Sequence, residues 1–332
     1  MVLATYNGAR FVGEQLETLA TQTRLPDELV VADDQSTDET MSIVRAFAGR
    51  APFPVVIVDR DTHVGTCANF EEGLLAASGD ILVICDQDDH WRPEKLAVMA
   101  DRMAERPEAL LAFSDAVLVD IAGDLLSRSR WRLAGFGPSQ WADMERDPFG
   151  QMMMRQIVSG CTAAIRKEIL PALLPFPAGL HPALPTMMYD RWISLLAAAA
   201  APVLTVPERL VAYRIHPSQQ IGIPALQLRR MMPQAALRLG QFVAPRVEKV
   251  GRFAYQQVHL REIHKRLVAS GLATAMSELR LSLAEEHLRT REQLDPTSAL
   301  RRVVPVMREY VDHDGYRRFS MGLGAALSDI AR

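Results

Sequence analysis

The sequence has little cysteine and no long apolar run, and both absences limit what the protein can be. Its 332 residues include three cysteines, Cys67, Cys85 and Cys161. Their spacing matches neither a zinc site nor a dithiol redox pair, which fits a reducing compartment. The longest apolar run, residues 193–206, is too short to span a bilayer and contains Pro202. No basic-then-apolar leader opens the chain, so we expect a cytoplasmic location.

A strong net charge and a glycine-rich phosphate loop are also absent. The chain has 37 Lys and Arg against 40 Asp and Glu, a net charge of −3. It therefore lacks the basic excess that is typical of general nucleic-acid binders. Neither G-x-G-x-x-G nor G-x-x-x-x-G-K-[ST] occurs after the first predicted strand, so dinucleotide-binding and P-loop functions lose their main support.

The charge that is present is unevenly distributed along the chain. Residues 1–224 carry 19 Lys and Arg against 29 Asp and Glu, a net charge of −10. Residues 225–332 carry 18 against 11, a net charge of +7. Such a separation suggests two parts with different partners. We therefore predict one domain over residues 1–224 and a basic C-terminal region over residues 225–332.

The pattern of apolar residues predicts an α/β fold for the first part. Short β-branched runs alternate with amphipathic stretches, which indicates a mainly parallel sheet with helices on both faces. Strands are expected over 2–4, 29–32, 55–58, 81–85, 110–113, 116–119, 203–206 and 210–214. Beyond Pro224 the strand signals disappear, and helices are expected over 226–239, 247–270, 273–294 and 300–311.

The strongest chemical signal follows the strand at 81–85, in Asp86-Gln87-Asp88-Asp89. Ligands of α/β sheets bind beyond the carboxyl ends of the strands. Alternation puts Asp86 and Asp88 on the same side, where two carboxylates can share Mg²⁺ or Mn²⁺ and leave positions open for phosphate oxygens. Alternatively, Asp89 caps the next helix and the other acids are solvated. Three acids in four residues favour the metal site.

A second acidic pair, Asp33-Asp34, occupies the equivalent position after the strand at 29–32. These carboxylates could accept hydrogen bonds from a ribose diol or a base N–H. Thr5, Tyr6 and Asn7 end the first strand and could contact the same base. The alternative is that Asp34 or Ser36 only shapes the turn and caps the following helix.

A further acid, Asp190, opens a predicted helix after a proline-rich loop. Aspartate is a common N-cap residue, and taken alone this position is better explained as a cap than as a catalytic group.

Together these segments resemble the family 2 glycosyltransferases, which are inverting enzymes with the GT-A fold. The resemblance covers about residues 2–222 and consists of several motifs in the family's order. They are Ala4-Thr5-Tyr6-Asn7-Gly8, Val31-Ala32-Asp33-Asp34-Gln35-Ser36-Thr37-Asp38, Asn69-Phe70, Ser78-Gly79-Asp80, Asp86-Gln87-Asp88-Asp89-His90-Trp91, Ser159-Gly160-Cys161-Thr162, Tyr189-Asp190-Arg191-Trp192 and Tyr213-Arg214-Ile215-His216. The Asp86 element has the form typical of bacterial rhamnosyl- and galactosyltransferase-like members. Tyr189 departs from this subgroup, which commonly has His there.

The resemblance implies a GT-A catalytic domain over residues 1–224 and a metal-dependent inverting mechanism. Asp190 would be the catalytic base, and Asp86 and Asp88 would hold Mg²⁺ or Mn²⁺. The implied contacts of the nucleotide sugar are Thr5, Tyr6, Asn7, Asp33, Asp34, Asp86, Arg214 and His216. A dTDP- or UDP-linked hexose or deoxyhexose would pass to a glycan or lipid-linked glycan, as in the synthesis of cell-surface polysaccharides such as O-antigen.

Two alternatives concern the whole chain and its C-terminal region. The chain could be a non-catalytic module that binds sugar nucleotides or assembles a complex, although three retained acids argue against it. The basic C-terminal helices could lie on an anionic membrane surface, with Phe319, Met321, Leu323 and Leu327 in contact with lipid. Alternatively, these helices pack on the first domain or form a homodimer interface.

Overall fold

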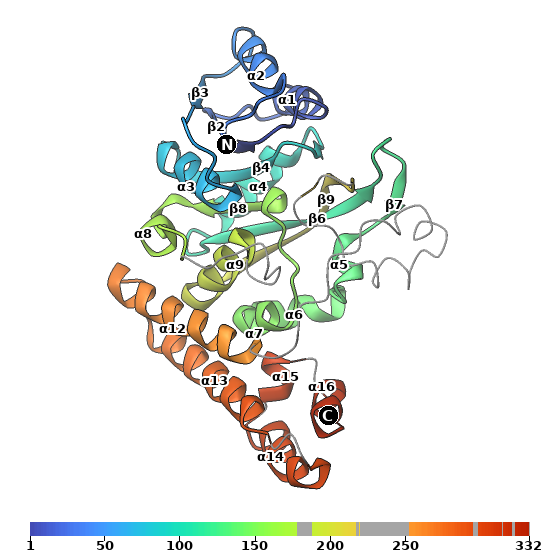
Figure 1. The fold of residues 1–332 in the computed structure, drawn as a ribbon, viewed down its shortest axis with the longest axis vertical. Coiled ribbons are helices and arrows are strands. Elements are labelled where there is room, and N and C mark those ends of the chain that lie inside the picture. The colour runs from blue at the N-terminus through green and yellow to red at the C-terminus, as the bar shows by residue number, and fades with distance from the viewer. Residues whose placement is uncertain are drawn as a thin grey trace.

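In the part of the chain that the structure describes, nine strands form one mixed sheet with helices on both faces (Figure 1). The structure is a computed structural model, and it describes residues 1–177, 188–216, 219, 252–294, 298–313, 315–320 and 323–331. The strands are β1 (Val2–Thr5), β2 (Leu29–Asp33), β3 (Val55–Val58), β4 (Ile81–Asp86), β5 (His90–Trp91), β6 (Leu111–Val119), β7 (Leu125–Ser127), β8 (Ala163–Arg166) and β9 (Val203–Arg214).

The strand order is β3-β2-β1-β4-β8-β6-β9-β5, with β7 beside β6. Strands β1 to β4 are parallel, as the alternation of strands and helices predicts. Beyond β4 the sheet is mixed, because β8 runs antiparallel to both β4 and β6, whereas β9 is parallel to β6. Two short strands were expected within 110–119 and two within 203–214, but each pair is one continuous strand, β6 and β9. Shifts of register near Asp115 allow the pairing of β6 with β9 to continue along both strands.

Helices α1 (Val12–Ala20), α2 (Thr40–Ala48) and α4 (Lys95–Glu105) pack on one face of the sheet, where their buried side chains share a cluster with β1, β2 and β9. The other face is covered by α3 (Thr66–Ala76), α7 (Pro148–Met154), α8 (Leu170–Leu173) and α9 (Tyr189–Ala200). Two further helices, α5 (Arg130–Leu133) and α6 (Pro138–Arg146), precede α7. The predicted α/β fold with helices on both faces is therefore confirmed.

The described C-terminal residues are helical. Some of their apolar side chains join the buried cluster on the face of the sheet that α3, α7, α8 and α9 cover. The helices are α12 (Arg252–Ser270), α13 (Ala275–Glu292), α14 (Ala299–Val311), α15 (Gly315–Phe319) and α16 (Leu323–Ile330). Apolar residues of α12 and α13, such as Leu260 and Leu281, belong to the same buried cluster as Trp192 of α9. The predicted domain boundary at residue 224 and the predicted helix at 226–239 lie outside the described residues.

Phe319, one of the residues that could contact a membrane, is instead buried in this cluster, with 4% of its surface exposed. Because α15 packs against α7 and α13, the alternative of packing on the first domain holds for this residue. Leu327 is exposed as expected, and the side chains of Met321 and Leu323 lie outside the described part. None of the described helices is both long and apolar enough to cross a membrane.

Gly73 allows α3 to lie close to the strands that carry the first polar loops. A Cβ at this position would lie 2.6 Å from Val2 Cγ1 and 3.3 Å from Ala32 Cβ. Both partners are short side chains on strands of the central sheet, so the sheet has little freedom to move aside.

We predict that Gly73→Ala lowers the free energy of unfolding by about 1–3 kcal/mol, because the added methyl group pushes α3 away from β1 and β2. Gly13→Ala in α1 is the matched control, since its Cβ would meet Ile43 Cγ2 at an ordinary 3.5 Å. Urea unfolding followed by circular dichroism measures both changes. A Gly73→Ala protein as stable as the wild type would contradict the close packing of α3.

Candidate active site

The carboxyl ends of β1, β2 and β4 open into a cavity of about 860 Å³. Its other wall consists of α5, the segment after α7 and the start of α9. This is where ligands of α/β sheets are expected. Nine of the ten predicted site residues line the cavity: Thr5, Tyr6, Asn7, Asp34, Asp86, Asp88, Asp190, Arg214 and His216. Asp33 is the one that does not.

Asp86 and Asp88, the predicted metal ligands, both line the cavity wall. Asp86 ends β4, and Tyr189 OH donates a hydrogen bond to its Oδ1 at 3.1 Å. Asp88 lies in the turn before β5, with its Oδ2 2.8 Å from His216 Nε2. In the described residues the second oxygen of each carboxylate has no hydrogen-bond partner. Two carboxylates with one oxygen each to spare are a donor set that fits a hard divalent cation.

Burial, reinforced by the negative charge of Asp88, raises the pKa of Asp86 to about 7. The hydrogen bond from Tyr189 acts in the opposite direction, because it stabilises the ionised carboxylate. A cation between the two acids would favour ionisation of both, so the raised pKa is consistent with a site shaped for positive charge.

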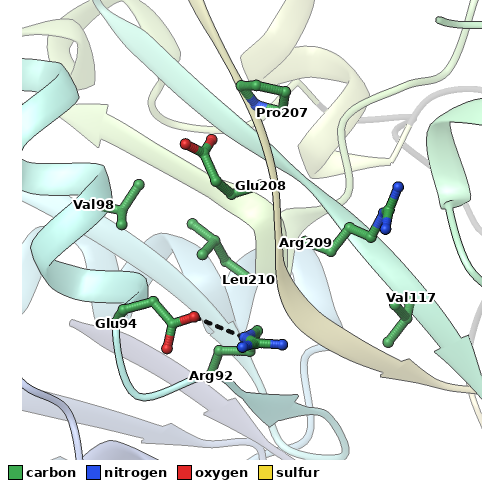
Figure 2. Close-up of a pocket in the computed structure, with 8 residues that line it drawn as sticks. All are labelled: Arg92, Glu94, Val98, Val117, Pro207, Glu208, Arg209 and Leu210. Atoms are coloured by element: carbon green, nitrogen blue, oxygen red, sulfur yellow. Dashed lines mark hydrogen bonds and ion pairs between the residues drawn. The ribbon is translucent and has the colours of Figure 1, made fainter.

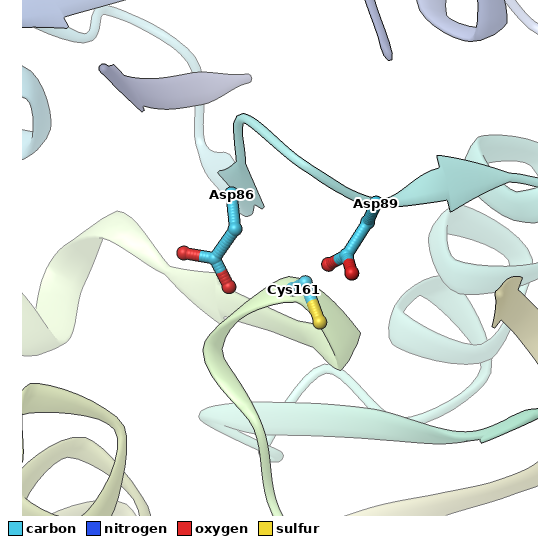
Figure 3. Close-up of side chains that lie close together, drawn as sticks. All are labelled: Asp86, Asp89 and Cys161. Atoms are coloured by element: carbon cyan, nitrogen blue, oxygen red, sulfur yellow. The ribbon is translucent and has the colours of Figure 1, made fainter. Parts of the chain in front are cut away.

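Asp89 lies beneath this pair and is buried, with 2% of its surface exposed. It does not cap α4, whose N-cap is Glu94, so that alternative is wrong. Figure 3 shows Asp89 with Asp86 and Cys161. One carboxylate oxygen of each acid and the Cys161 sulfur all lie within 4.8 Å of one another. One Asp89 oxygen accepts from the Arg214 amide at 3.2 Å, and the thiol of Cys161 also interacts with this carboxylate.

Lys95 supplies the positive charge next to this buried group. It is fully buried, its Nζ donates to the Cys161 carbonyl, and it lies 3.0 Å from the centroid of the Trp91 ring. Burial lowers the pKa of Lys95 to about 7, while the neighbouring Asp89 and Asp86 act in the opposite direction. Because a hard cation prefers oxygen to a thiol, Asp86 and Asp88 suit it better than a set that includes Cys161.

Asp33 connects the first two loops and does not reach the cavity. Its carboxylate accepts from Thr5 Oγ1 at 2.7 Å, from Ser36 Oγ at 2.6 Å and from the Ser36 amide at 2.8 Å. These bonds satisfy a buried charge within the protein. Ser36 is thereby engaged away from α2, whose N-cap is Glu39, so the predicted cap by Ser36 is wrong.

Asp34 lines the cavity, yet its carboxylate also holds the loop that leads to α3. It accepts from the amides of Val64 and Gly65 at 2.7 and 2.8 Å, and His63 Nδ1 lies 2.9 Å away. Gly65 has φ +88°, a conformation that favours glycine. The acid therefore shapes the rim of the cavity.

Tyr6 and His63 form an aromatic surface at this rim. Their ring centroids are 4.5 Å apart, and the Tyr6 residue is 45% exposed. Gln87 fixes the Tyr6 backbone through two bonds of 3.0 Å. Asn7 has φ +45°, and its Oδ1 accepts from the Thr37 amide at 2.9 Å. The sequence analysis did not identify His63, because nothing near it in the sequence indicates the contact with Tyr6.

Asp190 lies in the first turn of α9, on the wall opposite the β1 and β2 loops. The N-cap of α9 is Met188, without a side-chain cap bond, so the interpretation of Asp190 as the cap is wrong. Its Oδ1 accepts from the Arg191 amide at 2.6 Å. Burial raises the pKa of Asp190, and the charge of Arg130 partly opposes this rise. A carboxylate with a raised pKa is a better proton acceptor.

Tyr189 joins this wall to the metal candidates. It is buried against Phe70, with ring centroids 4.3 Å apart, and its hydroxyl bonds to Asp86. A Cβ on Gly160 would clash with that hydroxyl, so glycine is required there. The tyrosine that replaces the expected His thus connects α9 to the end of β4.

Arg214 and His216 hold the Asp88 turn in place. Arg214 donates to the carbonyls of Asp88 and Ile121 at 3.0 and 3.1 Å and pairs with Glu14 at 2.7 Å. His216 is buried beside Asp88, as described above. Both residues line the cavity, and their described contacts position the turn.

Two arginines of the cavity wall, Arg130 and Arg155, were not among the predicted site residues. Neither arginine belongs to a recognisable sequence motif, so the local sequence gives no signal for a role in the site. A second, shallower hollow of about 480 Å³ lies between α4 and β9 (Figure 2). It contains none of the predicted site residues, and its Arg92–Glu94 pair at 2.8 Å is exposed.

Comparisons with known proteins show the family and the fold to which this chain is similar. The sequence model of the family described as "Glycosyl transferase family 2" matches residues 1–173, more than half of the chain. An uncharacterized protein of Mycobacterium tuberculosis is 28% identical over 219 residues, 65% of this chain and 58% of the relative. An uncharacterized glycosyltransferase of Nostoc sp. is 25% identical over 221 residues, 65% of this chain and 64% of the relative. The chain thus spans less than two thirds of the length of these relatives.

Among solved structures, S. aureus TarS 1-349 in complex with UDP-GlcNAc is similar in fold. The TM-score is 0.51 at 18% sequence identity, and the match covers 95% of this chain and 88% of that chain. At this identity the similarity concerns the fold.

We predict that Tyr189→Phe raises the pKa of Asp86 above its value of about 7. The change removes the hydroxyl that stabilises the ionised carboxylate and keeps the ring against Phe70. An NMR titration of the carboxyl carbon measures the pKa. Tyr310→Phe, on α14, is the control and should leave it unchanged. An unchanged or lower pKa in Tyr189→Phe would contradict the role of this hydrogen bond.

Proposed function

The chain belongs to glycosyl transferase family 2, and on that basis we propose that it transfers a sugar from a nucleoside diphosphate donor to a hydroxyl of a glycan, with inversion at the anomeric carbon. The observation that carries the proposal is that Asp86, Asp88 and Asp190, from distant parts of the sequence, line one cavity at the carboxyl ends of the strands. The alternative of a non-catalytic module is disfavoured, because simple binding does not need all three acids.

The donor would lie across the ends of β1, β2 and β4. Its base would contact the aromatic rim of Tyr6 and His63, near Thr5, Asn7 and Asp34. The TarS structure that shares this fold contains UDP-GlcNAc, which supports a UDP- or dTDP-linked donor. The resemblance to rhamnosyl- and galactosyltransferase-like members supports a hexose or deoxyhexose of these types.

Asp86 and Asp88 would hold Mg²⁺ or Mn²⁺. When bound, such an ion neutralises the charge that develops on the departing diphosphate. Arg214 and His216 would keep the Asp88 turn in place and complete the diphosphate end of the site. We propose no direct role for Cys161, since hard cations are better served by oxygen.

Asp190 would act as the general base. The acceptor oxygen attacks the anomeric carbon from the face opposite the diphosphate, its proton passes to the Asp190 carboxylate, and the bond to the diphosphate breaks. One displacement inverts the configuration, so one base suffices. The raised pKa of Asp190 suits this role. We assign the reaction to a domain over residues 1–224, in the synthesis of a cell-surface polysaccharide.

The C-terminal helices offer a surface for an anionic membrane, and the proposal rests on α14. Leu300, Val304, Met307 and Val311 are 84%, 66%, 41% and 64% exposed and share one face of this helix. Exposed Arg301 and Arg308 border the stripe on one side, and Arg317 stacks on Tyr310 at 4.8 Å beyond the other. An apolar stripe between arginines fits a membrane with anionic headgroups. A second copy of this chain would bring the same basic face instead of negative charge.

We predict that Asp190→Asn lowers the rate of sugar transfer by about 10²- to 10⁴-fold, the usual contribution of a general base. Binding of the donor should change little, because Asp190 lies on the other wall. A panel of UDP-, dTDP- and GDP-sugars with Mn²⁺ or Mg²⁺, read by nucleotide release, first identifies the donor. Asp101→Asn, at an exposed position of α4 outside the cavity, is the control. Unchanged turnover in Asp190→Asn would refute the assignment.

We predict that the protein co-sediments with vesicles that contain anionic phosphatidylglycerol, and only weakly with neutral phosphatidylcholine vesicles. Arg301→Glu with Arg308→Glu should weaken this binding about tenfold or more, since each arginine contributes about 1 kcal/mol. Glu278→Gln, at an exposed position of α13, serves as the control. Equal binding to both vesicles, or a dimer in sedimentation that the double substitution dissolves, would contradict the lipid contact.

A further inference from the structure

The wall of the cavity that carries Asp190 also carries two arginines. Its lining residues include Arg130, Leu133, Ala134, Met154, Arg155, Gln156, Ser159, Gly160 and Met188. Apart from Asp190, the charged side chains in this set are the guanidinium groups of Arg130 and Arg155. This wall is therefore basic and partly apolar, whereas the wall at the strand ends is acidic.

Both guanidinium groups are held in place by oxygen atoms without charge. Arg130 donates from NH1 to the Ile157 carbonyl at 3.0 Å. Arg155 donates from Nε to the Gly135 carbonyl at 3.2 Å and from NH1 to Gln151 Oε1 at 2.7 Å. Within the described residues, neither guanidinium has a carboxylate within 4 Å.

Arg214 on the facing wall is different, because it pairs with Glu14 at 2.7 Å. Burial lowers the pKa of Arg155, and the charge of Asp143 opposes this only in part. Arg130 acts on Asp190 through its charge. Arg130 and Arg155 thus bring positive charge to the cavity, and neither forms an ion pair with a carboxylate among the described residues.

Each arginine is positioned by buried polar groups. Ser129, the N-cap of α5, donates to Asp115 Oδ2 at 2.6 Å, and the amide of Trp131 donates to Asp115 Oδ1 at 3.0 Å. Asp115 is itself buried on β6, so the backbone on both sides of Arg130 is fixed.

Arg191 of α9 fixes the backbone of Arg155. It is buried, and it donates to the carbonyls of Arg155 at 2.8 Å and Met153 at 3.0 Å, at the C-terminal end of α7. Arg191, next to Asp190 in the first turn of α9, therefore positions Arg155. The same helix turn thus carries Asp190 and supports the basic wall.

We propose that Arg130 and Arg155 bind an anionic group of the acceptor, a phosphate, diphosphate or carboxylate close to the hydroxyl that attacks. The inference rests on the proposed function, because it needs the acceptor to lie on the Asp190 wall. Guanidinium groups with spare N–H donors match the oxygens of such groups. A neutral sugar would leave both charges without a partner in a partly desolvated wall. The diphosphate of the donor is a poorer fit, since Asp86 and Asp88 lie on the opposite wall.

The first measurement is binding of inorganic pyrophosphate in the absence of metal, by isothermal titration calorimetry. It requires no turnover, so it tests anion binding by these two arginines even where no donor is hydrolysed, and the acceptor comparison below then separates the acceptor from the donor diphosphate. We expect the wild type to bind and Arg130→Gln with Arg155→Gln to bind about 10- to 100-fold more weakly, as for loss of charge-assisted hydrogen bonds. Lysine at both positions should restore part of the affinity. Arg146→Gln, an exposed arginine of α6 paired with Asp143, is the matched control.

The second measurement compares acceptors once donor hydrolysis has identified the donor. The set contains a neutral methyl glycoside, its 6-phosphate, the corresponding uronic acid, and the same sugar on a short-chain prenyl diphosphate. We expect at least one anionic acceptor to exceed the neutral one about tenfold in kcat/KM, and the variants to lose this preference. The acceptor with the highest kcat/KM shows whether the anionic group is a lipid-linked diphosphate, a sugar phosphate or a uronic acid.

Three outcomes would overturn the inference. They are equal use of neutral and anionic acceptors by the wild type, pyrophosphate binding that the double substitution leaves intact, and a rise in the KM of the donor with the acceptor preference retained. The last result would assign the arginines to the donor diphosphate. Failure of every donor to be hydrolysed would instead refute the proposed function, which keeps the two failures distinct.

Discussion

The arrangement of the site depends on one constraint, the crowding of carboxylates at the ends of three parallel strands. Buried charges are costly unless they are paired or hydrogen-bonded. Asp33 and Asp34 meet this cost with hydroxyls and backbone amides of neighbouring loops, whereas burial raises the pKa of Asp89 and so favours its neutral form. These bonds tie the loops into a rigid rim. The acids left facing the cavity with unused oxygens are Asp86 and Asp88.

The second wall is rigid for a different reason, because it extends from a shared hydrophobic core. Trp192 of α9 packs in one buried cluster with Leu260 of α12 and Leu281 of α13. At its other end, α9 places Tyr189 against Asp86 and Asp190 in the cavity. The basic C-terminal helices therefore support the catalytic region from behind, and α14 keeps an apolar face free of the core.

The local sequence pattern predicts the secondary structure well where burial alone determines it. It predicts the role of a polar side chain less well where several hydrogen-bond partners are available. The buried strand at 29–33 reads directly from its apolar run. Asp190 was ambiguous, since an acid at a helix start can cap, and only the backbone of Met188 decided against it. Lys95 looks like an ordinary exposed helix residue in the sequence, yet it lies under the site. The burial of Phe319 cannot be read from its own segment, because it depends on α7, which is far away in sequence.

The sequence by itself determined the family, the α/β fold and the positions of the acids at the strand ends, because these are encoded in short segments. It also determined that the charge divides between an acidic and a basic part. Tertiary structure decided which acid faces inward, as Asp33 does, and which faces the cavity. It also brought Arg130 and Arg155 beside Asp190. The physical reason is that charge pairing and desolvation depend on neighbours in space, and those neighbours come from elements far apart in the chain.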